Sequence, residues 1–360
     1  MNSYNIAIVP GDGIGKEIVP LAWDICSLCA ETFGFTLHSQ EYPWGAGHYK
    51  ETGKFITEEG LTALSDFDAI LFGAVGLPEV DDTLPAKLFT FRIRTHFEQY
   101  VNYRPAKLLP GIMSPLRDKG MDDIDFVVVR ENTEGEFVQN GRILNPMDPS
   151  GLATETNIFT RKGIERIAHY SFQLAQKRRK HLTNVTKSNT LIYTLSFWDQ
   201  VIEEVAKSYP GVTYRKMYVD AASANFVLRP EVFDVILTTN MIGDILSDLG
   251  GAVMGSLGLG PSGNINPEKQ YPSMFEPIHG SAPDIAGRGI ANPIGQIWSV
   301  ALMLRHLGEA QAANALESAI AKATSDGILT PDLNGSASTG QVASYIKDTI
   351  RKGVGEGVQK

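Results

Sequence analysis

Two aspartates, Asp244 and Asp248, lie four residues apart in the largely apolar segment 240–248. Residues at this spacing share one face of a helix, so the two carboxylates can bind one hard cation. No Lys or Arg occurs between Pro230 and Lys269 to neutralise the pair locally. The competing interpretation is two acids that interact with the dipole of a helix N-terminus. The spacing indicates a divalent-cation site, with the dipole interaction as the alternative.

Lys187 and Asp220 could also take part in catalysis. Lys187 follows an apparent strand, and a lysine beside a divalent cation can have its pKa lowered enough to act as a general base. Asp220 is a third candidate carboxylate for the cation. The alternatives are a solvated lysine and an aspartate that caps a helix beginning at Ala221. The sequence alone leaves these alternatives open.

Four arginines in the first half of the chain are candidates for binding an anion. Arg92 and Arg94 share one segment. Arg104 precedes a proline, and Arg130 ends the apolar run 126–129. Guanidinium groups brought together would bind the carboxylates of a small molecule through paired hydrogen bonds. Each arginine alone is equally compatible with a surface charge or a structural ion pair.

Two loops carry glycine and polar residues in patterns that suit a ligand. Residues 10–17 form a glycine-rich turn after the first apparent strand, but the third glycine is misplaced for a dinucleotide-binding fingerprint. A tight strand-to-helix turn explains these glycines equally well. Residues 275–293 place polar groups between glycines and prolines, which suits a nucleotide better than a core. For Ser281 and Asp284 the alternative is a capping box.

Length and charge limit the class of protein. The 360 residues can form two domains, and the net charge of −9 argues against nucleic acid or an anionic membrane as partner. The N-terminus has no signal-peptide pattern and no run is long enough to span a membrane, so we expect a cytoplasmic location. Cys26 and Cys29 have the spacing of a redox motif. They also lie on an apolar helical stripe, which favours packing in the core.

Short apolar runs alternate with amphipathic stretches along the chain, which predicts an α/β fold with a largely parallel sheet. The expected strands are 6–9, 69–72, 126–129 and 232–238. Three helices are expected: one that ends at residue 33, one around 163–176 and one at 291–307. Residues 136–157 are too long for an ordinary loop. We expect that segment to be a lid or an arm that clasps another subunit.

Six motifs occur together in one order. They are Pro-Gly-Asp-Gly-Ile-Gly at 10–15, Asn-Tyr-Arg-Pro at 102–105, Arg-Glu-Asn-Thr-Glu-Gly at 130–135, Thr-Lys-Ser-Asn at 186–189, the segment 243–248 and the loop 279–293. With these motifs the chain resembles the β-decarboxylating dehydrogenases, which include the isopropylmalate, isocitrate and homoisocitrate dehydrogenases. It resembles in particular their tartrate and D-malate dehydrogenase branch. The resemblance runs from Ile6 to about Val342.

The resemblance implies an isopropylmalate/isocitrate dehydrogenase-like two-domain fold, which is not the Rossmann fold. Residues 1–104 and 256–360 would form the nucleotide-side domain. Residues 105–255 would form the dimerisation and metal domain, with the clasping arm near 136–157. The family resemblance further implies a homodimer whose active sites are shared between the subunits.

Within such a site, Asp244 and Asp248 of one subunit and Asp220 of the other would hold Mg²⁺ or Mn²⁺. Lys187, assisted by Asp220, would accept the proton of the substrate hydroxyl. The resemblance assigns the substrate carboxylates to Arg94, Arg104 and Arg130, with Arg92 as the alternative to Arg94. The segment that holds Arg94 also shapes the pocket for the substrate's side group, and it contains Lys87, Phe89 and Thr90.

The resemblance implies a nicotinamide cofactor bound by the loop after residue 278. The residues expected to contact it are His279, Gly280, Ser281, Ala282, Asp284, Ile285 and Asn292. Asp284 would accept the hydroxyls of the adenosine ribose and repel an added 2′-phosphate, which favours NAD over NADP. A monovalent cation such as K⁺ is an additional candidate cofactor.

One catalytic position departs from the family pattern. The family has a tyrosine seven residues after the arginine of its Arg-Glu-Asn motif, and this chain has Phe137 there. That tyrosine is the expected proton donor to the enol that decarboxylation leaves. General acids contribute about 10²- to 10⁴-fold to a proton-transfer step. We therefore expect slow completion of the second half-reaction.

The leading hypothesis is an NAD-dependent, divalent-metal-dependent dehydrogenase that oxidises and β-decarboxylates a (2R)-hydroxy diacid of the malate class such as D-malate, tartrate or 3-isopropylmalate. One alternative is a dehydrogenase that oxidises without efficient decarboxylation because of Phe137. A second is a non-catalytic regulatory homologue that binds ligand, although the retained Lys187 and metal carboxylates argue against it. A metal-dependent phosphatase lacks a recognisable nucleophile motif.

Overall fold

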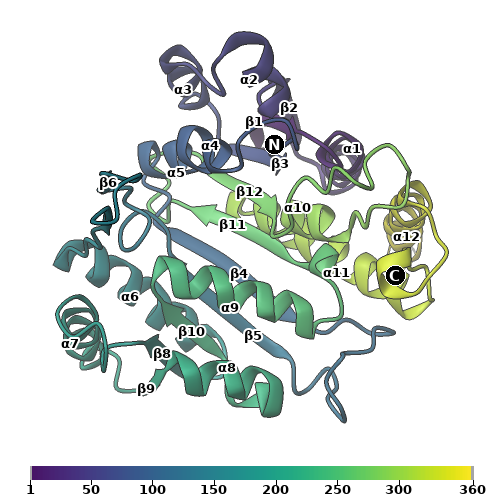
Figure 1. Cartoon of the computed structure of the whole chain (residues 1–360). Helices are drawn as coiled ribbons and strands as arrows, with labels where there is room; N and C mark the ends of the chain where they lie inside the picture. The colour runs from purple at the N-terminus through teal and green to yellow at the C-terminus, as the bar shows by residue number, and fades with distance from the viewer. Residues whose placement is uncertain (1, 358–360) are drawn as a thin grey trace.

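The computed structural model describes residues 2–357 and contains one large sheet of ten strands flanked by helices (Figure 1). Across the sheet the strands are β2 (Thr36–Glu41), β1 (Ser3–Gly11), β3 (Ala69–Ala74), β12 (Ser273–Pro277), β11 (Pro261–Ile265), β4 (Val101–Lys107), β5 (Asp125–Glu131), β10 (Val235–Thr238), β8 (His181–Thr186) and β9 (Thr213–Tyr218). The pairs on both sides of the sheet are parallel, and only β12–β11, β11–β4 and β4–β5 are antiparallel. The predicted α/β class with a mostly parallel sheet is confirmed.

Helices pack against the sheet, and most of them connect one strand to the next along the chain. They are α1 (Gly15–Phe33), α2 (Ala46–Thr52), α3 (Glu58–Leu64), α4 (Thr83–Pro85), α5 (Phe91–His96), α6 (Arg161–Lys177), α7 (Thr194–Ala206), α8 (Val219–Leu228), α9 (Asn240–Val253), α10 (Ile294–Leu307), α11 (Ala310–Ser325) and α12 (Thr339–Gly357). A π-helical segment, η1 (Ala86–Thr90), joins α4 to α5. No helix within residues 2–357 is long and apolar enough to cross a membrane.

The expected elements are present, with shifts that have local causes. The predicted strand at 232–238 begins only at Val235, because Pro230–Val232 forms a 3₁₀ turn. The predicted helix at 291–307 begins at Ile294, directly after Pro293. Both shifts follow from proline, whose fixed φ and missing N–H favour turns and helix starts.

The apolar stripe of α1 contributes both cysteines to the main core. Cys26 and Cys29 are free thiols that are completely buried. Burial raises the pKa of both thiols, and that of Cys29 rises to about 12. A redox site needs an accessible thiolate, so the structure contradicts the redox interpretation and supports packing as small hydrophobes.

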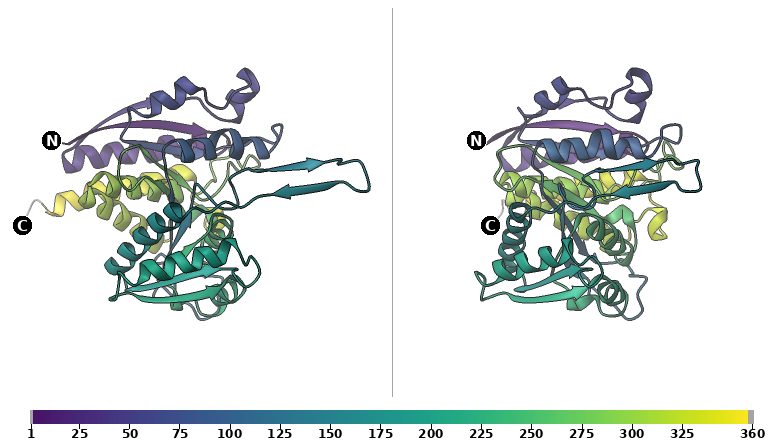
Figure 2. Two further views of the ribbon diagram at one scale, coloured as in Figure 1. Left: turned by 90° about the vertical axis from the view of Figure 1, so that its left-hand side faces the viewer. Right: turned by 60° about the vertical axis from the view of Figure 1, so that its left-hand side comes forward.

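The segment 136–157 forms an antiparallel hairpin that projects far from the body of the molecule (Figure 2). Its strands are β6 (Gly141–Leu144) and β7 (Leu152–Glu155), and every residue of both strands is exposed. The hairpin carries apolar side chains into solvent, including Ile143 and Met147. Its shape is that of an arm, and what it contacts in an assembly stays a prediction.

The two predicted domains correspond to two halves of one continuous sheet. The strands β1–β3, β11 and β12 belong to the first, and β5 and β8–β10 belong to the second. Strand β4 contains the predicted boundary at residue 104. Because hydrogen bonding continues across this boundary, the division into domains stays a prediction.

Candidate active site

Helix α9 carries Asp244 and Asp248 across the face of β4 and β5 (Figure 1). Their side chains are 44% and 54% exposed. Arg104 Nη1 lies 3.5 Å from an oxygen of Asp244 and 3.4 Å from one of Asp248. Arg130 forms a second ion pair with Asp244. The cations that are missing from the local sequence therefore come from two neighbouring strands, and neither acid lies in the first turn of the helix where the dipole would act.

These contacts set the charge state of the two acids. Burial acts to raise the pKa of Asp244, but the guanidinium groups of Arg130, Arg104 and Arg94 hold that pKa below its usual range. For Asp248, burial raises the pKa and the neighbouring Asp244 adds to the rise. Asp244 is thus held in its ionised form, which is the form that binds a cation.

The close packing of α9 on β5 depends on Gly243. A Cβ atom at this position would lie 2.6 Å from Cβ of Arg130, a distance that real contacts do not reach. Arg130 is buried, and its Nε donates to Oδ1 of Asn240 at 2.9 Å. On the neighbouring strand, Arg104 donates to Oγ of Ser247 at 2.7 Å. Glycine therefore lets the helix approach closely enough to hold both arginines.

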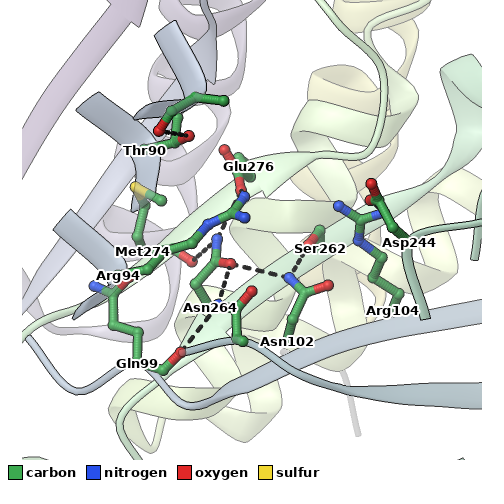
Figure 3. Close-up of polar contacts among 12 residues, drawn as sticks. Thr90, Arg94, Gln99, Asn102, Arg104, Asp244, Ser262, Asn264, Met274 and Glu276 are labelled. Carbon is green, nitrogen blue, oxygen red and sulfur yellow. Dashed lines mark hydrogen bonds and ion pairs between the residues drawn. The ribbon is translucent and has the colours of Figure 1, made fainter. Parts of the chain in front are cut away.

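Arg94 completes the cluster of positive charges. It follows the π-helical segment and is buried, and its Nη2 lies 2.7 Å from Oε1 of Glu276 (Figure 3). Arg94, Arg104 and Glu276 line a cavity of about 460 Å³, together with Thr90 and the loop 279–281. The fold therefore brings three of the four candidate arginines together.

Arg92 points elsewhere. It forms an ion pair with Glu58 and donates to the carbonyl of Ile56 at 3.1 Å. Of the residues that were expected to shape the substrate pocket, only Thr90 lines the cavity that contains Arg94. Phe89 is buried in a separate core cluster, and Lys87 lines a different cavity.

Glu276 and a group of buried amides beside it are the residues that the sequence did not reveal. The amide side chains are Asn102, Asn132 and Asn264, and the first two each donate to Asn264. Asn264 and Asn102 lie between Arg94 and Arg104 in Figure 3. Asn102 and Asn132 lie two residues from Arg104 and Arg130 respectively, inside the family motifs. This spacing of polar residues within apolar strands was the available signal.

Phe137 lies against the arginine cluster. The guanidinium carbon of Arg130 is 5.5 Å from the centre of its ring. The preceding residue, Glu136, accepts hydrogen bonds from Oγ1 of Thr239 at 2.7 Å and from the N–H of Met241 at 3.2 Å. Since both donors belong to the start of α9, Glu136 anchors this loop to the helix that carries the two aspartates.

Lys187 and Asp220 form a separate pair. Lys187 follows β8 and Asp220 lies in the first turn of α8, with 2.5 Å between Nζ and Oδ2. The ammonium group lowers the pKa of Asp220. No capping hydrogen bond from a side chain begins α8, so the cap interpretation of Asp220 finds no support. Within residues 2–357 no three His, Cys, Asp or Glu side chains are close enough to hold a metal. Asp220 therefore does not join Asp244 and Asp248 within one chain.

The glycine-rich turn and the loop 279–293 contact each other. The N–H of Ile14 donates to the carbonyl of Ser281 at 2.8 Å, and Gly13 has a φ of 55°. A Cβ atom on Gly13 would lie 2.0 Å from that carbonyl oxygen. The carboxylate of Asp12 accepts three backbone N–H groups, those of residues 46, 47 and 76. The glycines of this turn are needed for its backbone conformation and close contacts, which agrees with the tight-turn interpretation.

The residues of the predicted cofactor loop differ in their availability. His279 Nδ1 contacts the carbonyl of Gly280 at 3.0 Å, and burial lowers the pKa of the ring. Ser281 begins a series of turns without a helix, so the capping box with Asp284 is absent there. Asp284 is exposed. The side-chain amide of Asn292, in contrast, is already hydrogen-bonded within the protein: its Oδ1 accepts the N–H of residue 294, and its Nδ2 donates to Asp332. The remaining expected contacts, Ala282 and Ile285, are half-buried in this loop.

Comparisons with known proteins identify the family to which this architecture belongs. Residues 5–349 match the model of the isocitrate/isopropylmalate dehydrogenase family, and the chain belongs to this family. An isocitrate dehydrogenase structure from Methylococcus capsulatus superposes with a TM-score of 0.86 at 34% identity, covering 97% of this chain and 99% of that one.

Curated relatives carry the names of the predicted branch. The D-malate dehydrogenase [decarboxylating] of Escherichia coli is 45% identical over 96% of this chain and 98% of its own. The tartrate dehydrogenase/decarboxylase of Pseudomonas putida is 44% identical over 98% of this chain and 99% of its own. The family and the branch expected from the motifs are therefore confirmed.

Proposed function

We propose that this protein is an NAD-dependent, divalent-metal-dependent dehydrogenase that oxidises and β-decarboxylates a (2R)-hydroxy diacid of the malate class, such as D-malate, tartrate or 3-isopropylmalate. The observation that carries this proposal is the convergence of Arg94, Arg104 and Arg130 beside two half-exposed aspartates. Three buried guanidinium groups suit a small molecule with two carboxylates. The names of the relatives favour the same substrate class.

Asp244 and Asp248 fit a hard divalent cation, because both present carboxylate oxygens on one exposed helix face. We propose that they hold Mg²⁺ or Mn²⁺. When bound, such a cation polarises the hydroxyl and keto oxygens of the substrate. Arg104 and Arg130, which pair with these aspartates, are then free to bind the substrate carboxylates and to orient its C2–H bond.

We further propose that the base comes from a second subunit in a homodimer. Lys187, as the neutral amine, would accept the proton of the substrate hydroxyl in the partner's site, and Asp220 would orient its Nζ. The pair is accessible for this role, since the Asp220 side chain is 67% exposed. The adjacent helices α8 and α9 expose apolar side chains that a second copy would cover, which are Val227, Leu228, Met241 and Ile245.

The loop 279–293 is the proposed binding site for NAD, which accepts the hydride from C2. Asp284 is exposed and has no hydrogen-bond donor among the described side chains, so its carboxylate is available to a ribose. A monovalent cation such as K⁺ as an additional cofactor and a cytoplasmic location complete the proposal.

A second candidate function follows from Phe137. The ring lies beside Arg130 but carries no acid, so oxidation without efficient decarboxylation is the specific alternative. The Lys187–Asp220 pair argues against a purely regulatory homologue, because binding a ligand needs no base.

The test is to incubate the purified protein with NAD and Mn²⁺ and a panel of D-malate, the tartrate isomers, 3-isopropylmalate, isocitrate and homoisocitrate. NADH and CO₂ are recorded together. Equal formation of both on one diacid supports the full reaction, and NADH without CO₂ supports oxidation alone. No NADH on any diacid contradicts the proposed function.

A further inference from the structure

Asn264 is the centre of a buried polar row beneath the arginine cluster. It lies on β11 directly opposite Asn102 of β4. Its Oδ1 accepts Nδ2 of Asn102 at 3.0 Å and Nδ2 of Asn132 at 2.9 Å. Its own Nδ2 donates to Oε1 of Glu276 at 2.7 Å. All four side chains are buried, so water does not replace these bonds.

Glu276 links Asn264 to Arg94. The same oxygen, Oε1, accepts from Nη2 of Arg94 at 2.7 Å, and both side chains are more than nine-tenths buried. A buried ion pair is favourable only when further hydrogen bonds satisfy its polar atoms. Asn264 supplies such a bond, so its amide fixes the carboxylate that in turn fixes the guanidinium.

The other end of the row reaches the two remaining arginines. Asn102 and Arg104 are two residues apart on β4, and alternate residues of a strand share a face. Asn102 also lies opposite Arg130 in the β4–β5 pair. The amide of Asn264 therefore connects the helix that carries Arg94, through Glu276, to the two strands that carry Arg104 and Arg130.

We propose that Asn264 is a positioning residue that sets the spacing of the three substrate-binding arginines, which rests on the proposed function. Asn264 touches no reacting atom in this role. It acts through Glu276 on Arg94, and through Asn102 on the strand of Arg104. Loss of the amide should weaken binding of the diacid more than it slows the turnover of bound substrate.

Asn266 provides a matched control on the same segment. It is also a buried asparagine, and its Nδ2 donates to the carbonyls of Phe97 and Glu98 at 3.3 and 3.1 Å. Its Oδ1 accepts the N–H of Gln270 at 3.0 Å. None of its hydrogen bonds in the described structure reaches Glu276 or an arginine. A substitution there costs buried hydrogen bonds of which none, in the part of the chain that the structure describes, is made to an arginine of the cluster or to Glu276.

The experiment compares Asn264→Ser, Asn264→Asp and Asn266→Ser in the full-length protein with Mn²⁺. Asn264→Asp keeps an acceptor for the two asparagines but places a carboxylate against Glu276, so it tests that branch when Asn264→Ser folds poorly. KM and kcat for D-malate are measured, together with the rise in melting temperature that D-malate causes without NAD. We expect both Asn264 variants to raise KM by about tenfold or more, the size of one charge-assisted hydrogen bond, with kcat changed by less than about threefold.

Equal KM values in the Asn264 and Asn266 variants would overturn the proposal, because a general loss of packing would then explain the effect. A fall in kcat with unchanged KM would overturn it as well. Failure of the proposed function gives a different result: the wild-type protein itself would show neither turnover nor stabilisation by any diacid of the panel.

Discussion

The ring of Phe137 stacks on that of Phe91, with centroids 5.6 Å apart and planes inclined by 24°. The guanidinium of Arg94 lies 5.7 Å from the Phe91 ring centre, and that of Arg130 lies 5.5 Å from the Phe137 ring centre. Each ring of the aromatic pair thus contacts one of the proposed substrate arginines. The position where the family has its tyrosine therefore lies beside two of the proposed substrate arginines, and it is filled by a ring that cannot donate a proton.

Phe137→Tyr should accelerate the release of CO₂ relative to the formation of NADH. The added hydroxyl lies on a ring that already contacts Arg130, and as a general acid it would speed protonation of the enol by about 10²- to 10⁴-fold. Protonation removes the enol before it can recombine with CO₂. The measurement is the ratio of CO₂ to NADH during steady-state oxidation of D-malate. Phe91→Tyr adds the same hydroxyl to the other ring of the stack and is the control. An unchanged ratio in Phe137→Tyr would mean that another group protonates the enol.

Arg94→Met should lower kcat/KM for the diacid by roughly 10- to 100-fold, because it removes charge-assisted bonds to a carboxylate. Arg92→Met should change kcat/KM by less than about twofold, since Arg92 is bound to Glu58 at the surface and such pairs contribute little. Steady-state kinetics of both variants decide between the two arginines. A larger loss in Arg92→Met would reverse the assignment.

Asp248→Asn should weaken Mn²⁺ binding by about tenfold or more, because it removes one charged oxygen ligand. Titration of free Mn²⁺ by electron paramagnetic resonance measures the affinity without substrate. Asp326→Asn is the control, because Asp326 bonds Lys322 and Tyr345 on another part of the surface. Chelation of the metal should abolish NADH formation, and activity that persists in excess EDTA would contradict a metal requirement.

A mixture of Lys187→Ala and Asp244→Asn proteins should recover activity that neither variant has alone. If each site combines Asp244 of one subunit with Lys187 of the other, every mixed dimer contains one intact site. Random exchange then restores about a quarter of the wild-type activity. Co-refolding or co-expression followed by an NADH assay provides the measurement. No recovery, with mixed dimers demonstrated by mass spectrometry, would place the whole site within one chain.

His306 should make the folded state less stable as the pH falls from about 6.5 to 4. Burial and the nearby Lys269 lower the pKa of this histidine to about 4, below its ordinary value of 6.5. As the pH falls, the unfolded chain takes up the proton first, so stability is complete above the unfolded pKa and declines toward the folded one. The loss amounts to at most about 3 kcal/mol. His306→Gln should flatten the dependence of the unfolding free energy on pH in this range, whereas parallel curves for the two proteins would refute it.

Local pattern was sufficient for much of the fold. The apolar stripe that contains Cys26 and Cys29 and the run 126–129 were recognisable, because side-chain periodicity follows directly from helix and strand geometry. The long segment 136–157 was also recognisable as an irregular insertion, although its hairpin was not. Every residue of its strands is exposed, so no buried face sets the register of strand pairing through a hydrophobic pattern.

The candidate site needed the tertiary structure at its decisive points. The π-helical turn before Arg94 and the ion pair of Arg92 with Glu58 depend on how one helix packs against its neighbours. Glu276 contacts Arg94, and Asn264 contacts Asn102 and Asn132, only because segments distant in sequence come together.

The sequence by itself therefore determined the chemical groups: two aspartates on one helix face, a set of arginines, and Phe137 in place of a tyrosine. Spacing within a single element settles which side chains share a face, because that geometry is fixed over a few residues. Only the tertiary structure decided which faces meet. It joined Arg104 and Arg130 to Asp244, and it kept the Lys187–Asp220 pair apart from them. Those outcomes depend on the packing of β4, β5 and α9 against one another, which no local pattern encodes.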